Sequence, residues 1–188
     1  MTTFNSQLST FNLLYTYPET IVDGEGIRYS IYLAGCSHHC PGCHNPESWN
    51  PCAGEELTEE RIMEIIREIN ANPLLDGVTF SGGDPFYNPE AFFLLVKRIK
   101  EETHQNIWCY TGYLFDRELC KKSRARCEVT DEMLALLDVL VDGRFVEEKK
   151  NIMLLFRGSS NQRLIDVKKS LEQGSVAEWN PTIKRGID

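Results

Sequence analysis

Three cysteines lie close together in the first quarter of the chain, at Cys36, Cys40 and Cys43, directly after the apolar run 31–34. Thiolates are soft ligands that suit iron–sulfur clusters, zinc or copper(I). A Pro-Gly pair between the second and third cysteine favours the tight bend that can point all three at one centre. Because a [4Fe–4S] cluster is usually held by four thiolates, three grouped thiols predict a cluster with one iron left open for a substrate or cofactor.

A structural zinc site is the alternative for the same residues. The three cysteines together with His44, or with Cys52, can complete a closed tetrahedral site. The spacing does not decide between the two, because structural zinc is the commoner use of grouped Cys and His. A disulfide is less favoured, since the first residues lack a basic region followed by an apolar stretch and so give no sign of export.

The composition predicts a single globular domain. The chain has 188 residues, of which 41% are hydrophobic and 26% charged, as is typical of soluble proteins. No apolar run approaches the ~20 residues needed to cross a bilayer, so we expect no membrane partner and a cytoplasmic location. Lys and Arg number 20 against 28 Asp and Glu, a net charge of −8. This balance argues against a nucleic-acid partner, because binding to phosphates depends on basic residues.

Hydrophobic periodicity predicts strands that alternate with helices. We expect strands at residues 11–17 (an edge strand or a wrapping segment), 27–34, 77–80, 106–110, 139–141, 152–156 and 163–167. We expect one helix capped by Thr58, a second capped by Asn88 with Pro89 at its first position, and a third capped by Thr130 and running to Leu137. The first two carry apolar faces at helical spacing, formed by Ile62, Ile65, Ile66 and Ile69 and by Phe92, Leu95, Val96 and Ile99.

This alternation implies parallel β/α units with right-handed crossovers. A closed eight-unit barrel needs ~250 residues, so the chain predicts an open, partial β/α barrel of about five or six parallel strands. We expect one domain over residues 1–188, with an N-terminal wrapping segment at about 1–26 and a barrel core at about 27–170. Ligands of parallel sheets bind at the carboxyl ends of the strands. The cysteines and residues 81–85, 111–112 and 142–144 should therefore meet at one edge.

Several of these segments, in this order, resemble the radical S-adenosylmethionine (SAM) superfamily and, within it, the activases of glycyl-radical enzymes. The resemblance rests on the cysteine spacing, on Gly82-Gly83-Asp84-Pro85, and on residues 22–28 and 43–49. Residues 110–113, 141–145 and 156–163 are most similar to the short activases of anaerobic ribonucleoside-triphosphate reductase. Two features depart from the wider group: Gly42 stands where an aromatic residue often precedes the third cysteine, and no ferredoxin-like cysteine-rich insert follows Cys52.

The resemblance implies a reaction and its cofactors. Cys36, Cys40 and Cys43 would ligate three irons of a [4Fe–4S] cluster, and SAM would chelate the fourth. Reductive cleavage of SAM would give a 5′-deoxyadenosyl radical that takes a hydrogen atom from a glycine of the reductase. The implied partners are the reductase large subunit and a small electron donor such as flavodoxin or ferredoxin. Two alternatives to this function remain. The target could be another glycyl-radical enzyme, or the chain could be a zinc-stabilised interaction module without catalysis.

The resemblance also implies roles around SAM. Gly82 and Gly83 would approach its methionine end, and Asp84 would bind its ammonium group. The adenosine would contact Gly42, Cys43 and His44. The expected remainder of the SAM site is Thr111, Asp142, Gly143 and Arg144, with Arg144 paired to the carboxylate of SAM. Residues 157–163 could bind the partner's glycine loop, hold the open edge of the barrel or form a plain turn, and Cys109, Cys120 and Cys127 are expected to be ordinary thiols.

Overall fold

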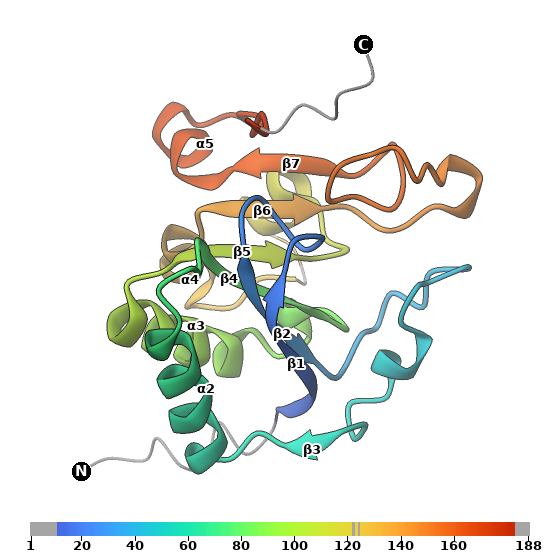
Figure 1. The fold of residues 1–188 in the computed structure, drawn as a ribbon. Coiled ribbons are helices and arrows are strands. Elements are labelled where there is room, and N and C mark those ends of the chain that lie inside the picture. The colour runs from blue at the N-terminus through green and yellow to red at the C-terminus, as the bar shows by residue number, and fades with distance from the viewer. Residues whose placement is uncertain (1–10, 122, 124, 183–188) are drawn as a thin grey trace.

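The computed structural model describes residues 11–121, 123 and 125–182. These residues form one seven-stranded sheet with helices packed against it (Figure 1). The strands, in spatial order, are β3 (Glu55–Glu56), β1 (Asn12–Thr20), β2 (Arg28–Leu33), β4 (Gly77–Gly82), β5 (Asn106–Tyr110), β6 (Val139–Asp142) and β7 (Arg163–Asp166). The helices are α2 (Glu59–Ala71), α3 (Pro89–Thr103), α4 (Thr130–Leu136) and α5 (Val167–Gln173). Short helical turns lie at Pro46–Trp49, Pro85–Tyr87, Phe115–Leu119 and Glu147–Lys149.

The expected alternation of strands and helices is confirmed, but fewer strands are parallel than the five or six predicted. The parallel set is β2, β4, β5 and β6, while β1, β3 and β7 pair antiparallel with their neighbours. Parallel neighbours need a long crossover, usually a helix. The β1–β2 connection is a short loop, and the β6–β7 connection contains only the turn Glu147–Lys149. Both connections therefore return the chain antiparallel.

Residues 12–20 of the expected N-terminal segment form a strand of the sheet, in agreement with the strand option for residues 11–17. Strand β1 lies between β3 and β2, and its pairing with β2 matches Leu13 to Leu33 and Thr20 to Arg28. Residues 1–10 of the expected wrapping segment lie outside the described part of the chain.

Two further predictions from the sequence are wrong. Residues 152–156 form turns, and the side chains of Ile152 and Met153 are 80% and 54% exposed. The run is apolar, but it pairs with no strand in the described part of the chain. Thr130 is the first residue of α4 rather than its cap, which is Val129; the Thr130 hydroxyl instead accepts from the backbone N–H of Cys127 at 2.9 Å.

Helices α2 and α3 begin where their caps predict. The Thr58 hydroxyl accepts from the Arg61 amide at 3.2 Å, and the Asn88 side chain accepts from the Ala91 amide at 3.3 Å with Pro89 in the first turn. Every isoleucine on the predicted face of α2 and every apolar residue on the predicted face of α3 is buried. Across the described residues, no helix combines the length and the apolar character that a membrane crossing requires.

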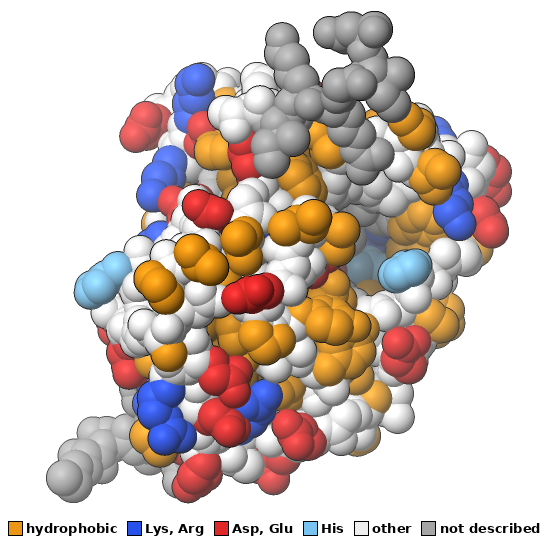
Figure 2. Space-filling view, in the orientation of Figure 1, with side chains coloured by type: hydrophobic (Ala, Val, Ile, Leu, Met, Phe, Trp, Pro, Cys, Tyr) orange, Lys and Arg blue, Asp and Glu red, His pale blue; other side chains and the backbone are white. Residues whose placement is uncertain are grey.

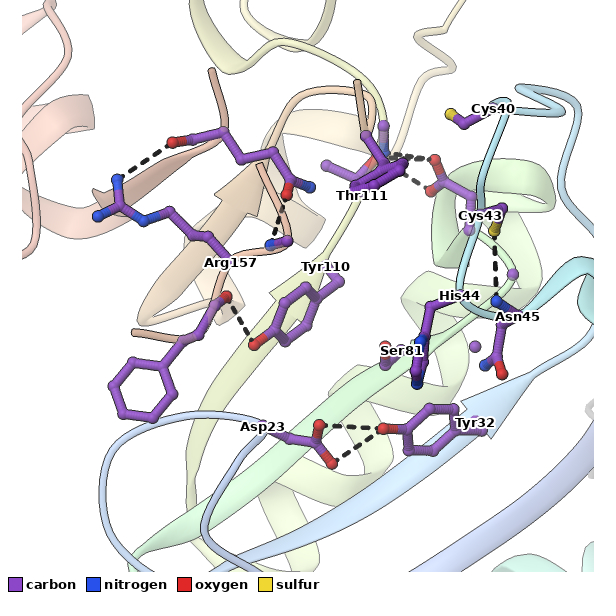
Figure 3. A pocket seen from close by; sticks show the side chains of 18 of the residues that line it. Asp23, Tyr32, Cys40, Cys43, His44, Asn45, Ser81, Tyr110, Thr111 and Arg157 are labelled. Atoms are coloured by element: carbon purple, nitrogen blue, oxygen red, sulfur yellow. Dashed lines mark hydrogen bonds between the residues drawn. The ribbon is translucent and has the colours of Figure 1, made fainter. Parts of the chain in front are cut away.

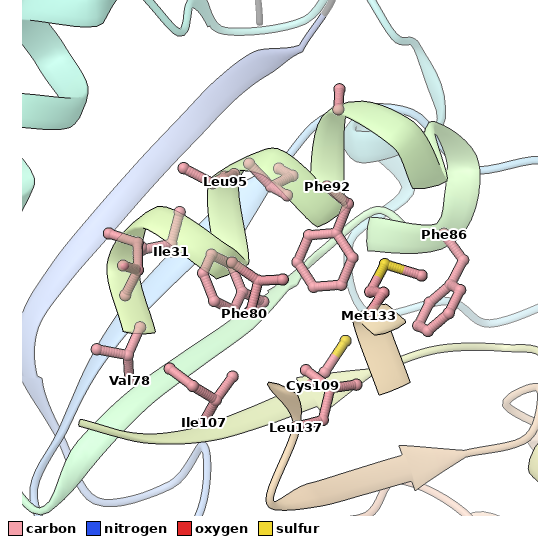
Figure 4. Packing of buried hydrophobic residues seen from close by; sticks show 14 of the residues in the cluster. Ile31, Val78, Phe80, Phe86, Phe92, Leu95, Ile107, Cys109, Met133 and Leu137 are labelled. Carbon is pink, nitrogen blue, oxygen red and sulfur yellow. The ribbon is translucent and has the colours of Figure 1, made fainter. Parts of the chain in front are cut away.

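The two faces of the parallel strands differ in chemistry. One face is apolar and packs beneath α2, α3 and α4, with Ile31, Phe80 and Ile107 fully buried in it (Figure 4). Successive strand residues point to opposite sides. The other face therefore carries Ser30, Tyr32, Thr79, Ser81, Trp108 and Tyr110. This mixed polar and aromatic face is not covered by those helices, and the cavity described next lies over it.

Candidate functional site

A cavity of about 890 Å³ lies at the carboxyl ends of the parallel strands, over the polar face of the sheet. Its walls are the loop 21–27, the cysteine loop (residues 36–43), the turns after β4, β5 and β6, and the segment 154–158. Figure 2 shows the hollow, with histidine side chains in it and hydrophobic side chains along its border. The structure thus brings together the four segments expected at this edge, because the carboxyl ends of neighbouring parallel strands lie side by side.

All three cysteines of the cysteine loop line this cavity, and none forms a disulfide. The loop bends through a hydrogen bond from the Cys43 amide to the Cys40 carbonyl at 3.0 Å, and the Asn45 amide donates to the Cys43 sulfur at 3.4 Å (Figure 3). Burial raises the pKa of the Cys36 thiol to about 11, although the backbone N–H groups of His38 and His39 lower it. Burial also raises the pKa of Cys40. A bound cationic metal centre would favour the thiolate forms.

The arrangement fits an iron–sulfur cluster better than a closed zinc site. Within the described ranges, no three His, Cys, Asp or Glu side chains are grouped so that they can hold a metal ion, and this holds for the three cysteines too, so the grouping alone does not distinguish the two centres. Cys52, which could have completed a zinc site, is exposed and lies outside the cavity lining. Three soft donors spread along one loop and facing a shared cavity suit a larger, polynuclear group.

Gly82 and Gly83 bring the end of β4 directly against the start of the cysteine loop. A Cβ at Gly82, whose φ is +102°, would lie 2.4 Å from the Leu33 carbonyl oxygen, and a Cβ at Gly83 would lie 2.3 Å from the Gly35 carbonyl oxygen. The Gly83 amide donates to Leu33 O at 2.7 Å. Both glycines line the cavity, but the close approach that requires them is between two segments of this chain.

Asp84 lines the cavity, as predicted, and also has a structural role. Its buried carboxylate accepts hydrogen bonds from the Phe86 amide at 2.9 Å, the Thr111 hydroxyl at 3.0 Å, the Gly112 amide at 2.9 Å and His38 Nε2 at 2.7 Å. These donors come from this chain, and the expected contact of Asp84 with the ammonium of SAM stays a prediction. Asp84 connects the carboxyl ends of β4 and β5 to the cysteine loop. Its partner His38 also lines the cavity and was not predicted as a site residue.

Asp142 and Gly42 do not line the cavity, in contrast to their predicted neighbours. Asp142 is fully buried, and its carboxylate accepts from Arg163 and from the Phe115 amide. Gly42 has a φ of +70°, and a Cβ there would lie 2.9 Å from the Glu147 carboxyl carbon. Besides the cysteines and the two glycines, the predicted residues that reach the cavity are His44, Asp84, Thr111, Gly143 and Arg144. The exposed Arg144 lies near Cys40 and lowers the pKa of that thiol, against the larger effect of burial.

The end of the cavity away from the sulfurs holds residues that the sequence did not single out (Figure 3). The Tyr32 hydroxyl donates to both oxygens of Asp23 at 3.0 Å, and the Tyr110 hydroxyl donates to the Phe156 carbonyl at 3.0 Å. Burial raises the pKa of both tyrosines, and the nearby Asp23 raises it further. Asp23 falls within the segment 22–28 that carries the family resemblance, and that was the only signal for it in the sequence.

A parallel sheet with a three-cysteine loop and a pair of glycines at its carboxyl edge defines a class of iron–sulfur proteins. The sequence model of the 4Fe-4S single cluster domain family matches residues 22–165. The chain is 38% identical over 157 residues to the anaerobic ribonucleoside-triphosphate reductase-activating protein of Haemophilus influenzae, covering 80% of this chain and 95% of that protein. Proteins of the same name from Escherichia coli K12 (39% over 150 residues, 78% of this chain and 92% of that protein) and Enterobacteria phage T4 (35% over 153 residues, 79% and 89%) are also similar. This chain belongs to the family of anaerobic ribonucleoside-triphosphate reductase-activating proteins.

Proposed function

We propose that this chain is a radical SAM enzyme that activates an anaerobic ribonucleoside-triphosphate reductase by generating a glycyl radical on it. The observation that carries the proposal is the meeting of Cys36, Cys40 and Cys43 with Gly82 and Gly83 on one cavity. The relatives at 38% and 39% identity, which cover most of both chains, support the same activity.

The chain's own residues have distinct tasks in this proposal. The three cysteines hold a [4Fe–4S] cluster, which supplies the electron that cleaves SAM into methionine and the 5′-deoxyadenosyl radical that takes hydrogen from the target glycine. Arg144 pairs with the carboxylate of SAM, since a guanidinium suits bidentate carboxylate binding. Asp23 and Tyr32, at the other end of the cavity, offer oxygen acceptors to a hydroxyl or an N–H group of the ligand.

Apolar side chains on the cavity walls would help to exclude water from a bound ligand. Ile21 and Val22 lie on one wall, and Leu154, Leu155 and Phe156 lie on another. Exclusion of water matters because a primary carbon radical attacks whatever is nearest. The proposal includes the partial-barrel shape expected for this class, the reductase large subunit as partner, a small flavodoxin- or ferredoxin-like electron donor, and action in the cytoplasm.

Iron binding and SAM cleavage test the proposal. After anaerobic reconstitution the full chain should bind about four irons, absorb broadly in the visible and release 5′-deoxyadenosine from SAM on reduction. Cys40→Ala should abolish this release. Cys52→Ala is the matched control, because Cys52 is exposed and lies outside the cavity lining. A colourless protein with about one zinc, or an unchanged yield from Cys40→Ala, would contradict the proposal.

The identity of the target needs a separate measurement. Electron paramagnetic resonance of the activated mixture should show a glycyl radical on the reductase and none on unrelated glycyl-radical enzymes mixed with the same activase. A radical on one of those enzymes, with none on the reductase, would favour the alternative target while leaving the SAM chemistry in place.

A further inference from the structure

His38 lies in the middle of the cysteine loop, two residues from Cys36 and two from Cys40. Its side chain is only 4% exposed, and its Nε2 lies 2.7 Å from Oδ2 of Asp84, which is 2% exposed. A histidine in a loop is usually solvated, so burial against a carboxylate 46 residues further along the chain indicates a specific contact.

The carboxylate that receives His38 is held by rigid elements. The Phe86 amide lies just after β4, and the Thr111 hydroxyl and Gly112 amide lie just after β5; all three donate to Asp84. The Asp84 amide also donates to the Gly35 carbonyl at 2.8 Å. Since an ionised carboxylate only accepts hydrogen bonds, His38 must donate through Nε2. The sheet thus provides a fixed acceptor, and the histidine attaches the loop to it.

The space around the His38 ring is matched to it. A Cβ at Gly112 would lie 2.4 Å from His38 Cδ2 and 2.6 Å from Nε2, and the Tyr113 ring packs edge-on against His38 with centroids 4.5 Å apart. Gly112 is not one of the glycines with a positive φ, so its backbone conformation does not require glycine. Glycine is required there because the His38 ring occupies the space that a side chain would need.

The backbone of the same residue also affects Cys36. The backbone N–H groups of His38 and His39 lower the pKa of the Cys36 thiol, against the larger effect of burial. Hydrogen bonds to ligand sulfurs are one of the factors that set the reduction potential of an iron–sulfur cluster. A side-chain contact that fixes the backbone at His38 therefore also fixes the surroundings of the Cys36 sulfur, two residues away.

We propose that His38, anchored by Asp84, is a positioning residue for the iron–sulfur site: it holds the cysteine loop in place, and so sets how firmly a cluster is held and at what potential it is reduced. This inference depends on the proposed function, because it assumes that the three cysteines hold a cluster.

Two substitutions disturb the contact from opposite sides. His38→Ala removes the donor, and Gly112→Ala displaces the ring while leaving the histidine in place. Mutation of a residue that holds a metal ligand in place typically changes metal affinity by 10–100-fold. We expect both reconstituted variants to release iron to a chelator about tenfold faster than the wild type and to show a shifted midpoint potential in an anaerobic redox titration. His38→Gln, whose amide can donate to Asp84, should recover at least half of each change.

Ser37→Ala is the control, because Ser37 is an exposed residue of the same loop and lies outside the cavity lining. It should keep the wild-type potential and rate of iron release. Unchanged values in His38→Ala and Gly112→Ala, or a His38→Gln variant no better than His38→Ala, would overturn the inference while leaving the proposed function intact. A wild-type chain that binds no cluster would instead overturn the proposed function, and this inference with it.

Discussion

Arg163 and Asp142 form a two-point ion pair that joins β7 to β6. Arg163 Nε donates to Asp142 Oδ1 at 2.9 Å, and its Nη2 donates to the other carboxylate oxygen. Asp142 is fully buried, whereas the Arg163 side chain is 28% exposed. The pair turns the Asp142 carboxylate away from the cavity, although the next residues, Gly143 and Arg144, line it.

Breaking this pair should destabilise the fold. Arg163→Met leaves a buried carboxylate without its counter-ion, and we expect the free energy of unfolding of the apoprotein to fall by about 3 kcal/mol. Chemical denaturation measures the loss. Arg117→Met is the control, because Arg117 is 74% exposed and its Asp116 contact is long, at 3.9 Å; it should cost less than about 1 kcal/mol. Equal losses from both variants would show that the pair has no special role.

A side chain at Gly83 should disturb the junction of β4 with the cysteine loop. The new Cβ would lie 2.3 Å from backbone, at the Gly35 carbonyl oxygen, and backbone gives way less readily than a flexible side chain. We expect Gly83→Ala to lower the free energy of unfolding by about 2–3 kcal/mol. Gly174→Ala is the comparison: its φ is +68°, but nothing lies within 4 Å, so only conformational strain of about 1 kcal/mol applies. If Gly83→Ala were as stable as the wild type, the Gly35 carbonyl would not exclude a side chain at this position.

Arg144 should affect SAM binding and leave stability unchanged. It is exposed and lines the cavity near Cys40. Loss of a charge-assisted contact with the carboxylate of SAM predicts that Arg144→Met raises KM for SAM about tenfold or more. Arg144→Lys, which keeps the charge but loses the bidentate geometry, should give a smaller rise. Steady-state cleavage assays over a range of SAM concentrations test this; an unchanged KM in Arg144→Met would remove Arg144 from the SAM site.

Asp138 should make the stability depend on pH in the acid range. Burial acts to raise its pKa, but hydrogen bonds from Lys168, the Ile107 amide and Lys100 outweigh that effect and lower it. Because the folded pKa lies below the unfolded one, the carboxylate stabilises the fold above the unfolded pKa of about 3.9, and this stabilisation is lost as the pH falls through the folded pKa.

Asp138→Asn should therefore cost about 1–2 kcal/mol at pH 7 and have a smaller effect as the pH falls below about 3.9. Denaturation curves at several pH values show the difference between the variant and the wild type. A difference that stays constant down to pH 2 would contradict this explanation.

Local signals predicted the individual elements well. Thr58 and Asn88 mark the starts of α2 and α3, and the predicted strand at 106–110 coincides with β5. Caps and periodicity act within one or two turns of the chain, so the sequence shows them directly. The prediction at 152–156 was wrong because an apolar run becomes a strand only if a neighbouring strand can pair with it.

The sequence predicted the three cysteines that line the candidate site, but not the contacts that hold the site together. The sequence placed Cys36, Cys40 and Cys43 on one loop, because their spacing is local. It could not reveal that Asp84 receives His38, or that Asp142 receives Arg163, since these partners lie 46 and 21 residues away.

The sequence by itself determined the class of this protein: three soft ligands after a strand, glycines after the next strand, and alternating elements long enough for parallel pairing. The tertiary structure decided which carboxylates face the cavity and which hold the framework. The physical reason is that a buried carboxylate takes its role from the donors that surround it, and those donors come from strand ends that meet only when the sheet is assembled. Asp84 lines the cavity and Asp142 does not, and the oxygens of both carboxylates are hydrogen-bonded by donors of this protein.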